Sequence, residues 1–325
     1  MDDRKMNQQP LSARQLGVAV MVGGLSWAGV QAGRMDWRWA LAALPVGILL
    51  GWLLLRRVNR QALFRGVGGG ALAVLYGGWA VVLLACVLHR VAGRIVHTGG
   101  SESHTLWILL LLTLPLLWIG CGKAAAFFRL VEVFWLAVIA VLLALGIGML
   151  PNVEWRYLLL APGDWRASAL AMAEVLGPGL FTLPHLHQVK PAPGDRRRGL
   201  AWLTALGLVG TALTVLVAGV LSPALAGQLA DPFFAAAGVM GNTARLEGLI
   251  SALWLLPDLT LAGLLAQSWG RRPRPAIAAA LGCALALTGL PALIPMEVLG
   301  GGTLLLAILT LLIPSTGEKI VVPFS

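Results

Sequence analysis

Ten long apolar stretches divide this sequence, and they constrain the fold more than any other feature. They lie near residues 13–33, 37–55, 67–92, 105–121, 129–150, 166–189, 199–221, 246–269, 275–294 and 298–314. An α-helix needs roughly 20 mostly apolar residues to cross the hydrocarbon core of a bilayer. The stretches therefore predict an all-α integral membrane protein with ten transmembrane helices. The connections between them are short, so we expect a single polytopic membrane domain over residues 1–325.

The composition excludes the commonest alternatives. Hydrophobic residues make up 58% of the chain and charged residues 12%, whereas a soluble domain has about 25% charged residues. A soluble enzyme and a nucleic-acid-binding protein are therefore not expected, even though the net charge is +10. The sequence also contains no recognisable catalytic motif, and its three cysteines lie far apart within apolar stretches. We expect no enzymatic activity, no cofactor and no bound metal ion.

The arginines and lysines predict the orientation in the membrane. If the N-terminus is cytoplasmic, the cytoplasmic segments of the ten-helix arrangement hold 17 of the 24 Lys and Arg residues. The seven on the other side are Arg34, Arg38, Arg90, Arg94, Arg156, Arg166 and Arg245. Positive residues are enriched on the cytoplasmic side of membrane proteins. We therefore expect a multi-pass membrane protein with both termini in the cytoplasm.

Ten helices divide into two halves of five, near residues 11–160 and 161–315, and an odd number inverts the second half relative to the first. Transporters built this way bind their substrates where matching helices are interrupted near the midplane. The first helix contains a glycine-rich segment from Gly23 to Gly29, and the sixth contains Gly177-Pro178-Gly179. Glycine tolerates an unwound backbone and proline removes a donor. These patterns predict a 5+5 inverted-repeat transporter fold with broken helices one and six.

A ligand site is expected between these two breaks. A zwitterionic amino acid would place its carboxylate near the amides of Ser26 to Gly29 and its ammonium near carbonyls around Gly177. The alternative is that the glycines of helix one only allow close helix packing, as glycines often do in membranes. The candidate ligand-binding residues are Gly23, Gly24, Ser26, Trp27, Gly29, Glu174, Gly177, Gly179 and Phe181.

Two acidic residues lie near the middle of predicted spans. Glu174 precedes the Gly-Pro-Gly segment by one turn, and Asp258 follows Pro257 in helix eight. Charged side chains are costly at the bilayer centre, so they usually face a cavity or a partner. Asp258 is therefore a candidate coupling or gating residue, and Glu174 a candidate ligand contact. In the alternative interpretation, each is a buried carboxyl group that hydrogen-bonds to a neighbouring helix.

Several short motifs, in order along nearly the whole chain, resemble those of the spore germination permeases, which are the B subunits of Ger-type germinant receptors. This family belongs to the amino acid–polyamine–organocation transporter superfamily. The similar motifs are Leu11-Ser12-Ala13-Arg14-Gln15-Leu16, the segment from Gly122 to Arg129-Leu130-Val131-Glu132, the segment from Pro151 to Leu158-Leu159, Arg245-Leu246-Glu247 followed by Trp254, and Ile313-Pro314.

The resemblance implies a subunit that senses small germinants, with amino acids expected, in the inner membrane of a bacterial spore. Its implied partners are an A-type membrane subunit, a C-type lipoprotein subunit and the surrounding membrane lipid. Two other functions remain open from the sequence. One is an amino acid secondary transporter driven by protons or sodium ions, and the other is a structural membrane subunit that binds no ligand.

The topology prediction can be checked with reporter fusions. Fusions after Arg65, Arg198 and Arg274 should report a cytoplasmic location, because these positions follow clusters of positive residues. A fusion after Gly100 should report the outer side. A cytoplasmic signal at Gly100 would contradict the ten-helix arrangement.

Overall fold

The structure is a computed structural model that describes residues 11–57, 66–99, 104–160, 163–189, 195–239, 244–270 and 274–312. Within these ranges the chain is helical, with one isolated β-bridge between Leu11 and Val189. The helices are α2 (Ala13–Gln31), α3 (Trp37–Arg57), α4 (Gly66–Gly99), α5 (Thr105–Cys121), α6 (Ala124–Met149), η2 (Leu150–Asn152), α7 (Trp155–Leu158), α8 (Trp165–Leu176), η3 (Gly177–Gln188), α9 (Asp195–Leu221), α10 (Pro223–Ala226), α11 (Pro232–Gly238), α12 (Ala244–Gln267), α13 (Arg274–Leu287), η4 (Leu290–Leu293) and α14 (Met296–Leu312).

Within the part of the chain that the structure describes, six segments are long and apolar enough to cross a membrane. They are Trp37–Leu54, Gly69–His97, Ala124–Asn152, Trp165–His185, Arg197–Leu221 and Ile250–Gln267. The apolar helices α5, α13 and α14 are shorter. Together with α2, these helices and the six segments account for all ten predicted apolar stretches, each of which contains a helix. The prediction of an all-α membrane protein is confirmed at this level.

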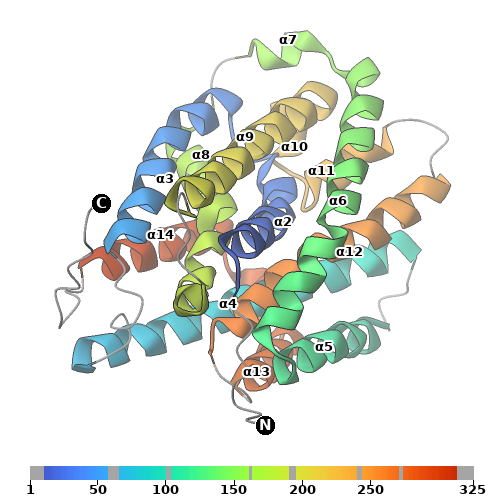
Figure 1. Ribbon diagram of the computed structural model, residues 1–325. Helices are drawn as coiled ribbons and strands as arrows, with labels where there is room; N and C mark the ends of the chain where they lie inside the picture. Colours follow the sequence, from blue (N-terminus) through green and yellow to red (C-terminus); the bar gives the residue numbers. More distant parts are fainter. Residues whose placement is uncertain are drawn as a thin grey trace.

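Helix α2 lies at the centre of the bundle (Figure 1). It begins with a capping box, in which the Ser12 side chain accepts a hydrogen bond from the Gln15 amide and the Gln15 side chain accepts one from the Ser12 amide, both at 3.1 Å. Every residue from Leu16 to Gln31 is buried, and α2 packs against α6, α8, α9 and α12. Because α2 is buried on all sides, the surrounding helices pack directly against it.

The predicted break in helix one is wrong, because α2 is a continuous α-helix from Ala13 to Gln31. Its glycines allow close packing instead. A Cβ atom at Gly23 would lie 3.4 Å from the Leu261 Cα atom of α12, and one at Gly24 would lie 2.3 Å from a methyl group of Leu206 on α9. The backbone amides near Ser26 are part of the helix, so they are not available to a ligand.

Helix six changes its helix type at the position of the predicted break, but it stays helical through it. Helix α8 ends at Leu176, and the chain continues from Gly177 as the 3₁₀ helix η3. This 3₁₀ helix has 12 residues, whereas such helices rarely exceed three or four. Pro178 cannot donate the backbone hydrogen bond that an α-helix would need there. The sixth apolar stretch is thus an α-helix followed by a 3₁₀ helix.

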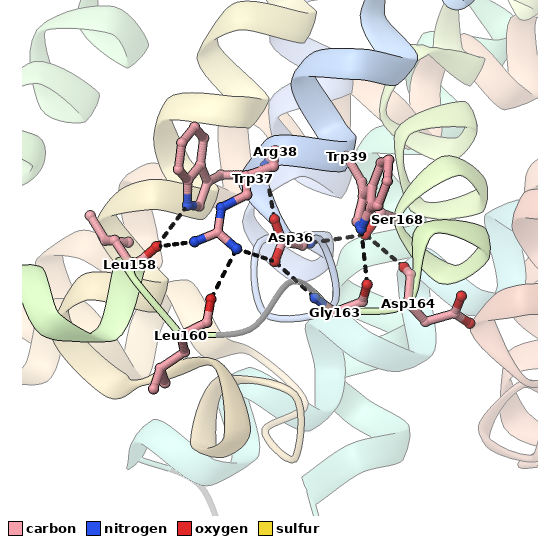
Figure 2. A network of polar contacts seen from close by, with 9 residues as sticks. All are labelled: Asp36, Trp37, Arg38, Trp39, Leu158, Leu160, Gly163, Asp164 and Ser168. Atoms are coloured by element: carbon pink, nitrogen blue, oxygen red, sulfur yellow. Dashed lines mark hydrogen bonds and ion pairs between the residues drawn. The ribbon is translucent and has the colours of Figure 1, made fainter.

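A polar network joins the α2–α3 connection to the segment before α8 (Figure 2). The Asp36 amide donates to the Ser168 hydroxyl and the Asp36 carboxylate accepts from the Gly163 amide, both at 2.9 Å. The Arg38 guanidinium donates to the carbonyls of Leu158 at 2.6 Å and Leu160 at 2.9 Å. The two connections are predicted to lie on the outer side, and the network brings them into contact.

Contacts at the opposite end involve segments predicted to be cytoplasmic. Arg14 near the start of α2 forms an ion pair of 3.2 Å with Glu132 of α6. The His185 ring nitrogen lies 3.0 Å from the carbonyl oxygen of Gln267, and the Gln267 side chain donates to the Ile119 carbonyl. These contacts join the start of α2 to α6, and the end of α12 to η3 and to the end of α5.

The packing of Gly24 makes a stability prediction. Gly24→Leu should force α2 away from α9 and destabilise the protein by about 1–3 kcal/mol, as overpacking does in a dense core. The matched control is Gly301→Leu on α14, where a Cβ atom would meet nothing within 4 Å. Thermal unfolding in detergent measures both, and equal losses would contradict the packing role of Gly24.

Candidate functional site

The carboxylate of Asp258 on α12 is the centre of a buried charge cluster. An Arg90 Nη atom lies 3.0 Å from one Asp258 oxygen, and Arg94 forms an ion pair with the other. The Ser26 hydroxyl of α2 donates to Asp258 at 2.6 Å and accepts a hydrogen bond from Arg90 at 2.7 Å. The three ionisable side chains are each at most 9% exposed. The cluster thus joins α2, α4 and α12 inside the bundle.

Arg90 and Arg94 are counted with the positive residues of the outer side, but neither lies in a connection between helices. Both lie within α4, which runs to Gly99 and remains apolar to His97. They are one helical turn apart, so their side chains project from the same face. Removing them from the outer connections leaves five Lys and Arg residues there instead of seven, which strengthens the charge bias behind the predicted orientation.

Aromatic rings cover the two guanidinium groups. The Arg90 guanidinium lies 4.8 Å from the centre of the Trp27 ring, and that of Arg94 lies 4.5 Å from the centre of the Phe234 ring. Trp254 packs against Phe234 at 5.8 Å between ring centres. An aromatic face attracts a cation and excludes water from it. The rings therefore stabilise the arginines where solvent does not.

A second buried polar pair lies beside this cluster. The Gln31 side chain of α2 donates a hydrogen bond to the Glu174 carboxylate of α8, and Glu174 is 2% exposed. Trp27 and Gln31 are four residues apart on α2, so the same face of this helix meets Arg90 and Glu174. Glu174 also interacts electrostatically with Arg90.

Several atoms of these two groups are buried without a hydrogen-bond partner. They are Nε and Nη1 of Arg90, Oε1 of Glu174 and Oε1 of Gln31. Buried polar atoms almost always have a partner, so each exception needs an explanation. The unpartnered atoms include donors on a cation and acceptors on a carboxylate and an amide. A small ligand with both an acidic and a basic group would complement them.

Asp231 is a further carboxyl group beside the cluster. It precedes α11 and interacts electrostatically with Arg90, Arg94 and Asp258. Burial raises the pKa of the Asp231 carboxyl group above its ordinary value, while the two arginines lower it. Asp231 thus places a further acidic group near the two guanidinium groups.

The other predicted site residues are not part of the charged cluster. Some pack between helices, and two line a separate cavity. A Cβ atom at Gly29 would lie 3.1 Å from the Trp254 ring, so Gly29, like Gly23 and Gly24, allows close packing. Phe181 is buried against Tyr76, with 5.3 Å between ring centres. Gly177 and Gly179 line an apolar cavity. Of the nine predicted ligand contacts, the structure brings Ser26, Trp27 and Glu174 to the charged groups.

The structure adds site residues that the sequence interpretation missed, chiefly Arg90, Arg94 and Gln31. A pattern in the sequence could have found the arginines. Apolar residues continue past Arg90 as Val91, Ala92, Ile95 and Val96, so the helix could be extended by two turns. Two arginines spaced by four residues would then need a buried counter-charge, which Asp258 provides.

Comparisons with known proteins assign no family. No family model matches the sequence, and no curated protein matches it. Among the described residues, no group of three or more His, Cys, Asp and Glu side chains could hold a metal ion.

The ion pairs of Asp258 predict a large effect of neutralising it. Asp258→Asn should destabilise the protein by about 3–5 kcal/mol, because it leaves two buried guanidinium groups without their counter-charge. The matched control is Glu132→Gln, which removes a partly exposed ion pair with Arg14 and should cost at most about 1 kcal/mol. Melting temperatures in detergent compare the two, and an unchanged melting temperature for Asp258→Asn would contradict the assignment.

Proposed function

We propose that this protein is a membrane-embedded receptor subunit that binds a small zwitterionic solute, with an amino acid as the expected ligand. The observation that carries the proposal is the set of buried, unpartnered polar atoms on Arg90, Glu174 and Gln31. Ionisable residues inside membrane spans are functional candidates by default, because their burial is costly. The ligand supplies the hydrogen bonds that these atoms lack.

The geometry of the site favours a specific orientation of the ligand. The ligand carboxylate accepts hydrogen bonds from the Arg90 guanidinium, which is the strongest type of anion contact available. The ligand ammonium donates to the Glu174 and Gln31 oxygens. This replaces the carboxylate position expected near Ser26 to Gly29, since the amides there belong to a continuous helix.

The packing of the helices supports ten crossings in a 5+5 inverted repeat. Exchanging each helix with its counterpart five spans later pairs α2 with α8, α3 with α9, α4 with α12, α5 with α13 and α6 with α14. An inverted repeat requires that each helix–helix contact in one half has an equivalent contact between the counterparts. The equivalent of the α2–α9 contact is the α8–α3 contact, and the equivalent of the α2–α6 contact is the α8–α14 contact. All four of these helix–helix contacts are present. Helices α3, α4 and α5 each pack against their own counterparts.

The role in germination comes from the sequence resemblance. A B-type subunit of a germinant receptor would lie in the spore inner membrane with both termini in the cytoplasm, and would act with A-type and C-type subunits. The alternative of an ion-coupled amino acid transporter uses the same fold, and the change of helix type at Gly177 is compatible with it. We interpret Asp258 as the counter-ion of two arginines rather than as a coupling residue. Protonation of its carboxylate would leave both buried guanidinium groups without a counter-charge.

The ligand site is tested by Arg90→Lys. This variant keeps the positive charge but loses most of the donors that the ligand needs, so binding of radiolabelled amino acids to the purified protein should be lost. The matched control is Arg156→Lys, on an exposed arginine that pairs with Glu154, and it should bind normally. Equal binding by both variants would contradict the site.

Two further measurements separate the candidate functions. Proteoliposomes that contain the protein should bind the amino acid without accumulating it, whereas accumulation would favour the transporter. Spores that lack the chain should fail to germinate with the same amino acid, and normal germination would contradict the receptor role.

A further inference from the structure

A second, apolar site lies between α2, α3, α8, η3, α9 and α14. It is a cavity of about 460 Å³, within the range of about 300–1,000 Å³ of small-molecule sites. Among the residues that the structure describes, its lining is mainly aliphatic, with tryptophans, glycines and two threonines, and none of these lining residues is charged. Its lining shares no residue with the ion pairs around Asp258.

The two threonine hydroxyls and the Trp39 ring nitrogen of the lining already have partners within the protein. The hydroxyls of Thr182 and Thr303 donate to the carbonyls of Gly179 and Leu299, at 2.7 and 2.8 Å. The Trp39 ring nitrogen donates to the Gly163 carbonyl at 3.0 Å. A polar ligand would find little to bind here and would lose its own hydration. The occupant of this cavity must therefore be apolar.

The lining of the cavity extends along α3 and includes exposed residues of this helix. One face of α3 lines it from Trp39 to Leu54, a length of about 22 Å at the rise of an α-helix. Trp39 and Val46 on this face are 39% and 67% exposed. Only 17% of the α3 span is buried inside the protein, so most of this helix faces the bilayer. The shape fits an extended hydrocarbon chain.

One end of the cavity has the chemistry of a membrane interface. Trp39 and Trp165 line it there, and tryptophan is enriched at the level of lipid headgroups. The guanidinium of the exposed Arg166 lies 5.5 Å from the centre of the Trp165 ring. Arginine binds phosphate oxygens through charge-assisted hydrogen bonds. An apolar chain in the cavity can thus be continuous with a phosphate group at Arg166.

We propose that this cavity binds one acyl chain of a membrane phospholipid, whose phosphate lies at Arg166. The acyl chain contacts η3 at Gly177, Gly179 and Leu180, which line the cavity. At this point the α-helix α8 changes to a 3₁₀ helix. The lipid therefore fills the space that this irregular segment leaves against α3 and α14. The proposal requires only that the protein spans a membrane, and it is independent of the amino acid site.

The test uses a phosphatidylglycerol that carries a photoreactive diazirine near the end of one acyl chain. The full-length protein is reconstituted with this lipid, irradiated and digested, and the labelled peptides are identified by mass spectrometry. Labelling should concentrate on α3, α8 and α14 and should persist when excess unlabelled lipid is added. Labelling of the exposed face of α6, around Leu136 and Leu143, should instead disappear on dilution.

Two filling variants and a control complete the test. Ala43→Phe and Ala169→Phe place a ring in the cavity and should abolish its labelling, whereas Ala137→Phe on the exposed face of α6 should not. Arg166→Gln should reduce the labelling that survives dilution. Even labelling of all lipid-facing helices in the wild-type protein would overturn the proposal, whether or not the variants fold. Unchanged cavity labelling in folded filling variants would also overturn it.

Discussion

The pairing of Arg90 and Arg94 with Asp258 is the interaction on which the interior of this protein depends. In hydrocarbon neither a guanidinium nor a carboxylate is tolerated alone, since each has lost its hydration. The ion pairs fix α12 against α4, and the Ser26 hydroxyl connects both to α2. Two cations meet one anion, so the cluster needs the aromatic rings of Trp27 and Phe234 and the nearby acids Glu174 and Asp231.

Helix α2 connects the charged groups to the other helices of the bundle. Its face with Trp27 and Gln31 meets the charged groups, while Gly23 and Gly24 allow α12 and α9 to approach on other sides. A continuous helix buried on every side cannot unwind without exposing backbone groups to hydrocarbon. The irregular backbone is instead in η3, beside the apolar cavity. The polar site and the irregular segment are thus distinct parts of the interior.

The sequence predicts the helices well because span length and apolar composition are local properties. It also locates the change of helix type at Gly177, where proline removes a backbone donor. It does not predict the role of Gly23, since glycine serves both unwinding and close packing, and only the neighbouring Leu261 backbone decides between them. Arg90 is missed for a related reason. A charged residue at the end of an apolar run resembles a loop residue until its partner on a distant helix is known.

A double-mutant cycle between Arg94 and Asp258 tests the central claim most directly. The unfolding free energies of the wild type, Arg94→Gln, Asp258→Asn and the double variant are compared in one detergent. The double variant has the same net charge in the cluster as the wild type, so it should be more stable than Asp258→Asn alone. The account predicts a coupling energy of more than about 1 kcal/mol, as expected for residues in contact. Strictly additive losses would show that these residues do not hold the bundle together through their ion pair.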